Sequence, residues 1–266
     1  MRAYVAGVAL WGPGLPGWTD SRAVLAGETP YTPTDIAPPV PDILSANERR
    51  RTGVTVRLAL VAAQQAMAMA GFPPGSVASV FGCSNGDGAV VHAILETLAQ
   101  PGGQVSPTQF HNSVHNAAAG YWTIATRSNK GAVTLTGHDA TFAVSLLKAM
   151  AELYVERQPI LLCVHDSPIP APMAQKRPTL APFAACLVLT PEPCGRTLAR
   201  IGVTHEATAV SAAEEATILA SLLALSQGNP AARALPLLEL LARRRPGIIR
   251  ARLPHGAVAI DVRPWP

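Results

Sequence analysis

The chain has 266 residues, of which 48% are hydrophobic, 5% aromatic and 14% charged. This composition excludes a mainly disordered chain, because disordered segments are poor in hydrophobic residues and rich in charge. Typical globular proteins have about 25% charged residues, so the 14% found here is too little to cover a lone monomer comfortably and predicts that some apolar surface meets a partner.

The net charge of +4 does not indicate a nucleic-acid-binding protein. The basic residues gather only in two short runs, at 49–51 and 243–245, with no stripe of basic and aromatic side chains. The four cysteines lack the spacing of a metal site, and a chain of this length needs no disulfide framework. We therefore expect no metal, no cofactor and a reducing cytoplasm. We also expect no signal peptide and no membrane span, since no apolar run reaches the roughly 20 residues that cross a bilayer.

The first 190 residues alternate between predicted strands and helices. In chain order, these are a strand over 3–10, a helix near 21–26, a helix over 57–70, a strand over 77–81, a helix over 89–98, a strand over 132–136, a helix over 140–155 and strands over 160–164 and 184–189. Strands this uniformly apolar are covered on both faces. The pattern predicts an α/β fold with a sheet sandwiched between helices.

The pattern of apolar and polar residues changes after Pro193. We expect a strand over 197–203, a helix to about residue 226, a helix over 230–245, and closing strands over 248–252 and 258–262. Two capping-box patterns predict helix starts, Ser45 with Glu48 and Ser211 with Glu214. The chain is therefore predicted to consist of an α/β domain over residues 1–193 and a reduced C-terminal α/β portion over residues 194–266 packed on it.

Cys83 is the first candidate for chemistry, because it lies in the turn between a predicted strand and a predicted helix, where amides at the helix start could activate a thiol. No histidine is adjacent in sequence to act as its base, and the small residues around it also fit a tight backbone turn. The surrounding glycine loop, residues 82–88, lacks both the Lys-Ser/Thr ending of a P-loop and the spacing of a dinucleotide-binding loop.

Residues 110–122, Phe-His-Asn-Ser-Val-His-Asn-Ala-Ala-Ala-Gly-Tyr-Trp, form the densest cluster of polar and aromatic residues. On a helix, His111 and His115 would share one face, which is compatible with a metal site, but no third ligand lies nearby. The alternative is an element that lines a cavity or an interface, where His, Asn and aromatic side chains supply orientation and contact area.

Several landmarks in one order resemble the N-terminal half of the β-ketoacyl synthases, over roughly residues 1–190. They are Arg50 and Arg51 ahead of the alanine-rich helix that ends at 70–71, Gly-Cys-Ser-Asn-Gly at 82–86, Asn-Ala-Ala-Ala-Gly at 116–120, Gly-Ala-Val-Thr-Leu-Thr-Gly at 131–137 and Ala-Ala-Cys-Leu-Val-Leu-Thr at 184–190. Residues 110–122 are most similar to the short chain length factors of aryl-polyene-type gene clusters.

The resemblance implies a thiolase-like layered fold whose N-terminal half is complete and whose C-terminal half is strongly reduced. It places the nucleophilic cysteine of the family, within one residue, at Asp139. A carboxylate is a poor substitute, because the family's reaction passes through a thioester. The two catalytic histidines of the family belong to the shortened half, and neither His205 nor His255 lies in a matching motif.

The resemblance therefore implies a chain length factor that does no catalysis itself. Such a subunit pairs with a catalytic β-ketoacyl synthase, meets acyl carrier protein through that partner, and helps to bound the tunnel of a growing polyene, polyketide or fatty-acid-like chain. In the family, the strand before the nucleophile pairs across the dimer, which places residues 132–136 at the interface. The residues expected at the tunnel or the interface are Phe110, His111, His115, Asn116, Trp122, Val133 and Leu135.

Two other functions stay open at this point. The chain could be an independent acyl-transfer or thioester-hydrolysing enzyme that uses Cys83 or the pair His111 and His115. It could also be a structural homo-oligomer with no tunnel. Under the first alternative, changing Cys83 to Ala should abolish turnover. Identical product lengths and identical pairing after Phe110 is replaced by Ala and then by Trp would favour the second.

Overall fold

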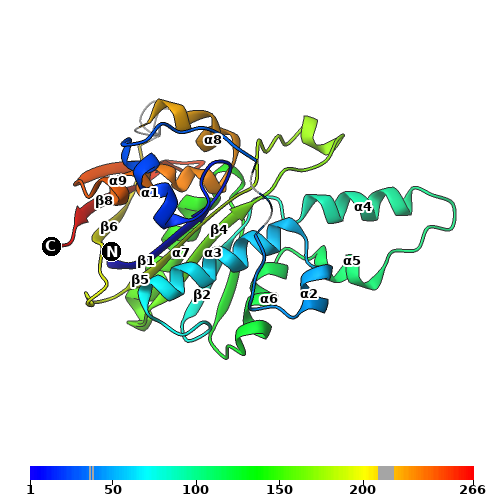
Figure 1. The fold of residues 1–266 in the computed structure, drawn as a ribbon, viewed down its shortest axis with the longest axis horizontal. Coiled ribbons are helices and arrows are strands. Elements are labelled where there is room, and N and C mark those ends of the chain that lie inside the picture. Colours follow the sequence, from blue (N-terminus) through cyan, green and yellow to red (C-terminus); the bar gives the residue numbers. More distant parts are fainter. Residues whose placement is uncertain (36, 38, 209–218) are drawn as a thin grey trace.

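The chain forms an eight-stranded mixed sheet with helices on both faces, as seen in a computed structural model that describes residues 1–35, 37, 39–208 and 219–266 (Figure 1). The order of the strands across the sheet is β3-β2-β4-β5-β1-β6-β8-β7. The strands are β1 (Arg2–Trp11), β2 (Ala78–Gly82), β3 (Ala132–Leu135), β4 (Ile160–Asp166), β5 (Phe183–Thr190), β6 (Ala199–Glu206), β7 (Gly247–Arg252) and β8 (Ala257–Pro264). The α-helices are α1 (Trp18–Ala26), α2 (Ala46–Arg51), α3 (Val54–Ala70), α4 (Gly88–Leu98), α5 (Pro107–Asn112), α6 (Ala117–Thr126), α7 (Thr141–Glu156), α8 (Leu223–Gly228) and α9 (Leu235–Arg243).

The sheet is buried on both faces at its centre, as the uniformly apolar strands predicted. Every residue of β4 and β5 is buried. Helices α3 and α6 pack on one face, and α1, α7 and α9 pack on the other. Strand β2 runs parallel to both β3 and β4, whereas β5 and β1 are antiparallel to their neighbours. The carboxyl ends of the three parallel strands, β2, β3 and β4, therefore lie at the same end of the sheet.

Local sequence signals account for the helix boundaries. The predicted capping box is confirmed at α2, where Ser45 Oγ accepts a hydrogen bond from Glu48 N at 3.3 Å and Glu48 Oε2 accepts one from Ser45 N at 3.0 Å. Helix α3 ends at Gly71, which takes the left-handed conformation (φ 76°) that only glycine adopts without strain. The second predicted capping box, Ser211 with Glu214, lies outside the described residues.

Residues after 193 continue the same sheet. Strand β6 pairs antiparallel with the free side of β1, and β8 and β7 follow. Without β6, residues 2–5 of β1 would be an exposed edge, which is prone to wrong pairing. The helix predicted over residues 230–245 begins as a 3₁₀ turn (Ala231–Ala234) and continues as α9. The division of the chain at residue 193 stays a prediction.

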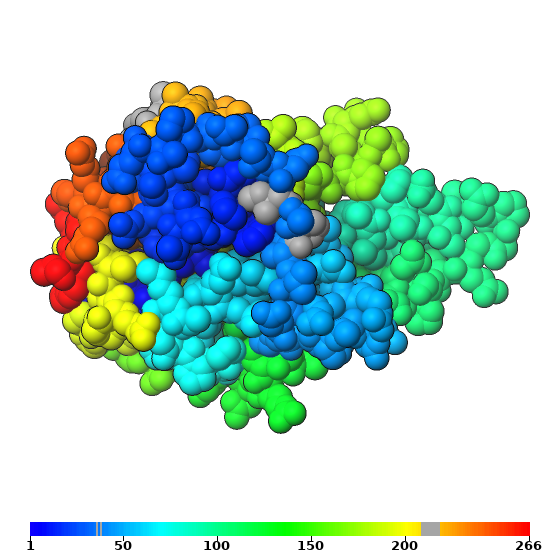
Figure 2. Space-filling model, in the orientation of Figure 1, coloured from blue at the N-terminus to red at the C-terminus, as the bar shows by residue number. Residues whose placement is uncertain are grey.

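A helical arm projects from the body of the molecule. It consists of α4 and α5 with the turn that joins them, and it begins after the carboxyl end of β2 and extends past the sheet (Figure 1). The space-filling view shows the arm, in teal, standing clear of the remaining chain (Figure 2). Helix α4 has an apolar sequence, yet it buries only Gly88. An apolar helix without cover predicts contact with another protein.

Candidate functional site

A polar cluster lies where the three parallel strands end. The segment after β2 supplies Cys83, Ser84 and Asn85, the segment after β3 supplies Asp139, and β4 ends at Asp166. Ligand sites of α/β sheets usually lie at the carboxyl ends of parallel strands. The cluster is therefore the first candidate for a functional site in this fold.

Asp166 is the buried centre of the cluster. Its Oδ1 accepts hydrogen bonds from Ser84 N at 2.8 Å and Asn85 N at 3.2 Å, and its Oδ2 has no partner among the described residues. Burial raises the pKa of Asp166 to about 7, although the amide donors and the positive charge of Arg177 oppose the shift. Asp166 can therefore hold a proton at neutral pH, but it is fully shielded from solvent.

Cys83 does not have the environment of a nucleophile. The side chain is buried, and its thiol can donate to Asp166 Oδ1 at 3.4 Å or to Gly86 O at 3.8 Å. Burial, with the negative charge of Asp166 in second place, raises the pKa of this thiol well above its ordinary value. Because the thiolate is the reactive form, the structure disfavours acyl transfer by Cys83 and supports the tight-turn interpretation.

We expect alkylation to discriminate Cys83 from Cys194. Cys194 is exposed and Cys83 is buried, so brief treatment of the native chain with iodoacetamide should modify Cys194 and leave Cys83 unmodified, as read by peptide mass spectrometry. Denaturation in urea should make both thiols react, which controls for detection of the Cys83 peptide. Equal labelling of both residues in the native chain would contradict this view of the site.

Asp139 forms an ion pair where the resemblance placed a cysteine. Its Oδ1 accepts a hydrogen bond from Arg177 Nη1 at 2.6 Å. Partial burial favours the neutral acid, but the hydrogen bond and charge of Arg177, aided by the charges of Arg233 and His138, outweigh it and lower the pKa of Asp139. The carboxylate is therefore ionised at neutral pH and is held by a guanidinium.

Arg177 joins three segments of the cluster. Besides Asp139, it donates from Nη2 to Ser84 Oγ at 2.6 Å and from Nε to Asn85 Oδ1 at 3.2 Å. Asn85 in turn donates from Nδ2 to Thr179 Oγ1 at 3.1 Å. A pocket of about 260 Å³ lies beside the loop after β3 and is lined by Gly137, His138, Asp139, Ala140, Arg233, Arg252, Leu253 and Pro254.

The residues of the 110–122 cluster are distributed between the arm and the core. Phe110 and His111 lie exposed on α5, and the ring of His111 meets that of Tyr121 edge-on at 5.8 Å. His115 lies beyond the end of α5, and its Nε2 is 2.7 Å from Cys83 O. The two histidines therefore do not share a helix face, which the metal interpretation required. In the described part of the chain, no three His, Cys, Asp or Glu side chains come close enough to hold a metal ion.

The remaining predicted residues occupy three different environments. Asn116 is exposed at the start of α6, and Trp122 is 1% exposed in the core beneath α3. Val133 and Leu135 are half-buried in β3, an outermost strand of the sheet that pairs only with β2. Their roles at a tunnel or an interface stay predictions.

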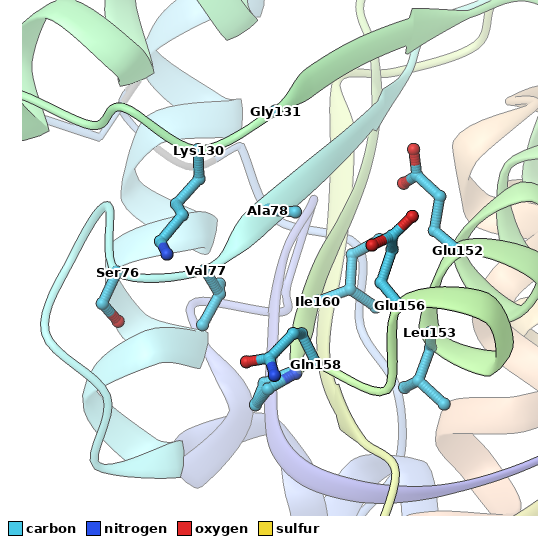
Figure 3. Close-up of a pocket in the computed structure, with 11 residues that line it drawn as sticks. Ser76, Val77, Ala78, Lys130, Gly131, Glu152, Leu153, Glu156, Gln158 and Ile160 are labelled. Carbon is cyan, nitrogen blue, oxygen red and sulfur yellow. The ribbon is translucent and has the colours of Figure 1, made fainter.

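A second pocket lies at the opposite end of the strands, away from the polar cluster. It has a volume of about 320 Å³ and is lined by residues around the amino ends of β2, β3 and β4. Figure 3 shows Lys130 on one side and the carboxylates of Glu152 and Glu156 on the other. The lining of this pocket includes Ser76 and Lys130 but lies at the amino ends of the strands. Ligand sites of α/β sheets usually lie at the carboxyl ends, so the polar cluster there remains the better candidate.

Sequence reasoning missed Asp166, Arg177 and Asn229. Asp166 could have been found, because it directly follows an apolar strand, as the polar residues after β2 do. Arg177 lies in a proline-rich segment with no periodic pattern. Asn229 is fully buried, and its Nδ2 donates to Asp166 O at 3.2 Å and to Ala181 O at 2.7 Å, which ties the C-terminal residues to the site.

The fold is a layered α/β fold with one mixed sheet between helices. A family model described as "Beta-ketoacyl synthase, N-terminal domain" matches residues 25–227, and the chain belongs to that family. A search of curated proteins found no match. Within the described residues, no helix is both long and apolar enough to cross a membrane.

Solved structures of ketosynthases share this fold, which confirms the predicted fold class. A ketosynthase in complex with its chain length factor from Xenorhabdus doucetiae has 18% sequence identity and a TM-score of 0.72, with 98% of this chain and 99% of that chain covered. The ishigamide ketosynthase/chain length factor has 15% identity and a TM-score of 0.71 over the same shares of the chains. A type II polyketide synthase acyl-carrier protein in complex with its ketosynthase, AntDE:AntF, has 13% identity and a TM-score of 0.75, again over 98% and 99%.

Proposed function

We propose that this chain is a non-catalytic chain length factor, which pairs with a catalytic β-ketoacyl synthase and shapes the tunnel in which an acyl chain grows. The observation that carries the proposal is the ion pair of Asp139 with Arg177 at the position where the family's cysteine is expected. A carboxylate held in this way cannot form the thioester that the family's reaction requires. The buried thiol of Cys83 offers no replacement.

Two surfaces support a partner. Strand β3 pairs with β2 on one side only, so its other side presents backbone groups that can pair with a strand of another chain. The arm adds exposed apolar side chains, which are Leu95, Leu98 and Phe110, and the exposed Val114 follows α5. Strand β3 is the edge of the sheet next to β2, and the arm begins after the carboxyl end of β2 (Figure 1). Scarce charge is expected in a chain that covers such a surface with another subunit.

The proposed product class is a polyene, a polyketide or a fatty-acid-like chain, and acyl carrier protein would reach this chain through the catalytic subunit. Solved structures of similar fold that are named as ketosynthase and chain length factor pairs support the heterodimer. Tunnel length depends on the bulk at the tunnel's end, since an added side chain there overpacks the space. Phe110, which is 67% exposed on the arm, is the residue we propose for that contact.

Co-expression tests the proposed function directly. The chain should co-purify in equal amounts with a catalytic β-ketoacyl synthase, and the isolated chain should take no acyl group from acyl carrier protein, as read by intact-protein mass spectrometry. Replacing Phe110 by Ala or Trp should shift the product lengths of the pair in opposite directions. Val155→Ala, an exposed apolar change away from the arm, is the control.

Stoichiometric acylation of the isolated chain would refute the non-catalytic role. Stable self-association without a ketosynthase, with product lengths unchanged in both Phe110 variants, would favour the structural homo-oligomer instead.

A further inference from the structure

Strand β3 needs support from outside itself. It has four residues, is an outermost strand of the sheet, and among the described residues pairs only with β2. Short edge strands fray unless their ends are held. The loop that follows is also unfavourable on its own, because His138 adopts a left-handed conformation (φ 54°) that non-glycine residues adopt at a cost.

The side chain of Arg177 contacts this loop from a segment that follows an inner strand of the sheet. It lies in the connection between β4 and β5, whereas Asp139 follows β3, and the order β3-β2-β4-β5 separates the two segments by the strand β2. The guanidinium crosses the end of β2 by binding Ser84 and Asn85 and then binds Asp139. One side chain thus ties the outer strand to the buried centre, and the planar fork of arginine suits such a three-way contact.

We propose that Arg177 is a positioning residue for the partner interface, because it holds the loop after β3 through Asp139 and so fixes the edge strand that a ketosynthase subunit pairs with. This inference rests on the proposed function. This loop is also tied to the end of β2 by the exposed hydrogen bond from Thr136 Oγ1 to Ser84 O at 3.2 Å. Ser84 is itself held by Arg177.

The effect of Arg177 is expected to be local. The Asp139 side chain is 53% exposed, and ion pairs with such exposure contribute little to global stability. Arg177→Gln should therefore shift the melting temperature by no more than about 3 °C, while amide hydrogen exchange in β3 becomes at least about tenfold faster. Pairing with the ketosynthase should weaken by a similar factor, since the partner must then order the strand itself.

The experiment compares four variants with the wild-type chain. Arg177→Gln removes the guanidinium group, and Asp139→Asn removes the carboxylate. Arg177→Lys keeps the positive charge but not the planar group, so it should restore only part of the protection of β3 from exchange and part of the affinity. Arg157→Gln is the matched control, because Arg157 pairs with Glu192 at 2.9 Å in an exposed ion pair at the other end of α7. Exchange is measured on the isolated chain, and affinity is measured with the ketosynthase that co-purifies with the wild-type chain.

A general loss of structure would change exchange across the sheet, whereas the inference requires a change confined to β3 and its loop. Unchanged β3 exchange with unchanged affinity in Arg177→Gln would overturn it. An equal effect in Arg157→Gln would overturn it as well. If the wild-type chain pairs with no ketosynthase, the proposed function fails, and exchange at β3 alone decides whether Arg177 positions the strand.

Discussion

Replacing Thr134 by proline should weaken pairing with a ketosynthase subunit while leaving the isolated chain folded. Gly131 O accepts a hydrogen bond from Ser79 N of β2, and Leu135 O accepts one from Cys83 N just after β2, each at 3.0 Å. Because N–H and C=O of one residue lie on the same side of a strand and the sides alternate, the backbone groups of Ala132 and Thr134 point away from β2. Proline at 134 therefore removes an outward donor and breaks no bond to β2.

The size of the effect follows from the group that loses its partner. A strand of the ketosynthase that pairs with β3 would keep a C=O buried and unpaired, which costs about 1–3 kcal/mol. The affinity should therefore fall at least about tenfold, and the proline ring adds a steric conflict. The melting temperature of the isolated chain should change by only a few degrees, since Pro is tolerated on edge strands whose N–H faces solvent.

Two variants separate the backbone contribution from the side-chain contribution. Thr134→Val keeps the amide and the volume of the side chain, so it should pair like the wild-type chain. Val133→Pro should instead destabilise the isolated chain, because the backbone of Val133 faces β2. Affinity is measured by titration of each purified variant into the ketosynthase. Normal affinity of the Thr134→Pro variant would show that the edge of β3 is not the interface.

Most of the sheet was predictable because its strands are apolar along their whole length. Strands β4 and β5 are buried on both faces, so every residue carries the same signal. The attachment of β6 to β1 was not predictable in this way. Both strands have apolar residues, but nothing local says which free edge a later strand joins. The continuation of one sheet by the C-terminal residues is a consequence of that long-range pairing.

The candidate site was predictable only in part, because its defining contact joins distant residues. Asp139 stood out through its place in a family pattern. Arg177 lies 38 residues away in a segment without periodicity, and only the order of the strands brings the two together. Likewise, the thiol of Cys83 looked activated by its position before a helix, but burial beside Asp166 has the opposite effect on its pKa. Local sequence signals report neither burial nor a charge that arrives from another strand.

Replacing Asp166 by asparagine should change the pH dependence of stability. The ordinary pKa of Asp is 3.8, and burial raises the pKa of Asp166 in the folded chain to about 7. Between these values the folded chain binds the proton and the unfolded chain does not, so wild-type stability falls as pH rises from about 4 to about 7. The loss is about 1.4 kcal/mol for each pH unit in that window, and above pH 7 it stays constant.

Asparagine keeps an oxygen for the amides of Ser84 and Asn85 and does not titrate. Its amide nitrogen replaces Oδ2, which has no partner among the described residues, and this adds a cost that does not depend on pH. The free energy of unfolding of Asp166→Asn, relative to the wild-type chain, should therefore rise between pH 5 and pH 7 by about 2–3 kcal/mol.

The neighbours of Asp166 are not expected to produce this pH dependence. His165 is neutral throughout the range, because burial lowers its pKa to about 3. The thiol of Cys83 stays protonated, because its pKa is raised well above its ordinary value. Urea unfolding at pH 5, 6, 7 and 8 measures the difference, with Asp42→Asn, a change at an exposed aspartate, as the matched control. If the free energy of unfolding of Asp166→Asn differs from that of the wild-type chain by the same amount at all four pH values, Asp166 is ionised in the folded chain. Its carboxylate, rather than its acid form, then accepts the hydrogen bonds from the amides of the segment after β2.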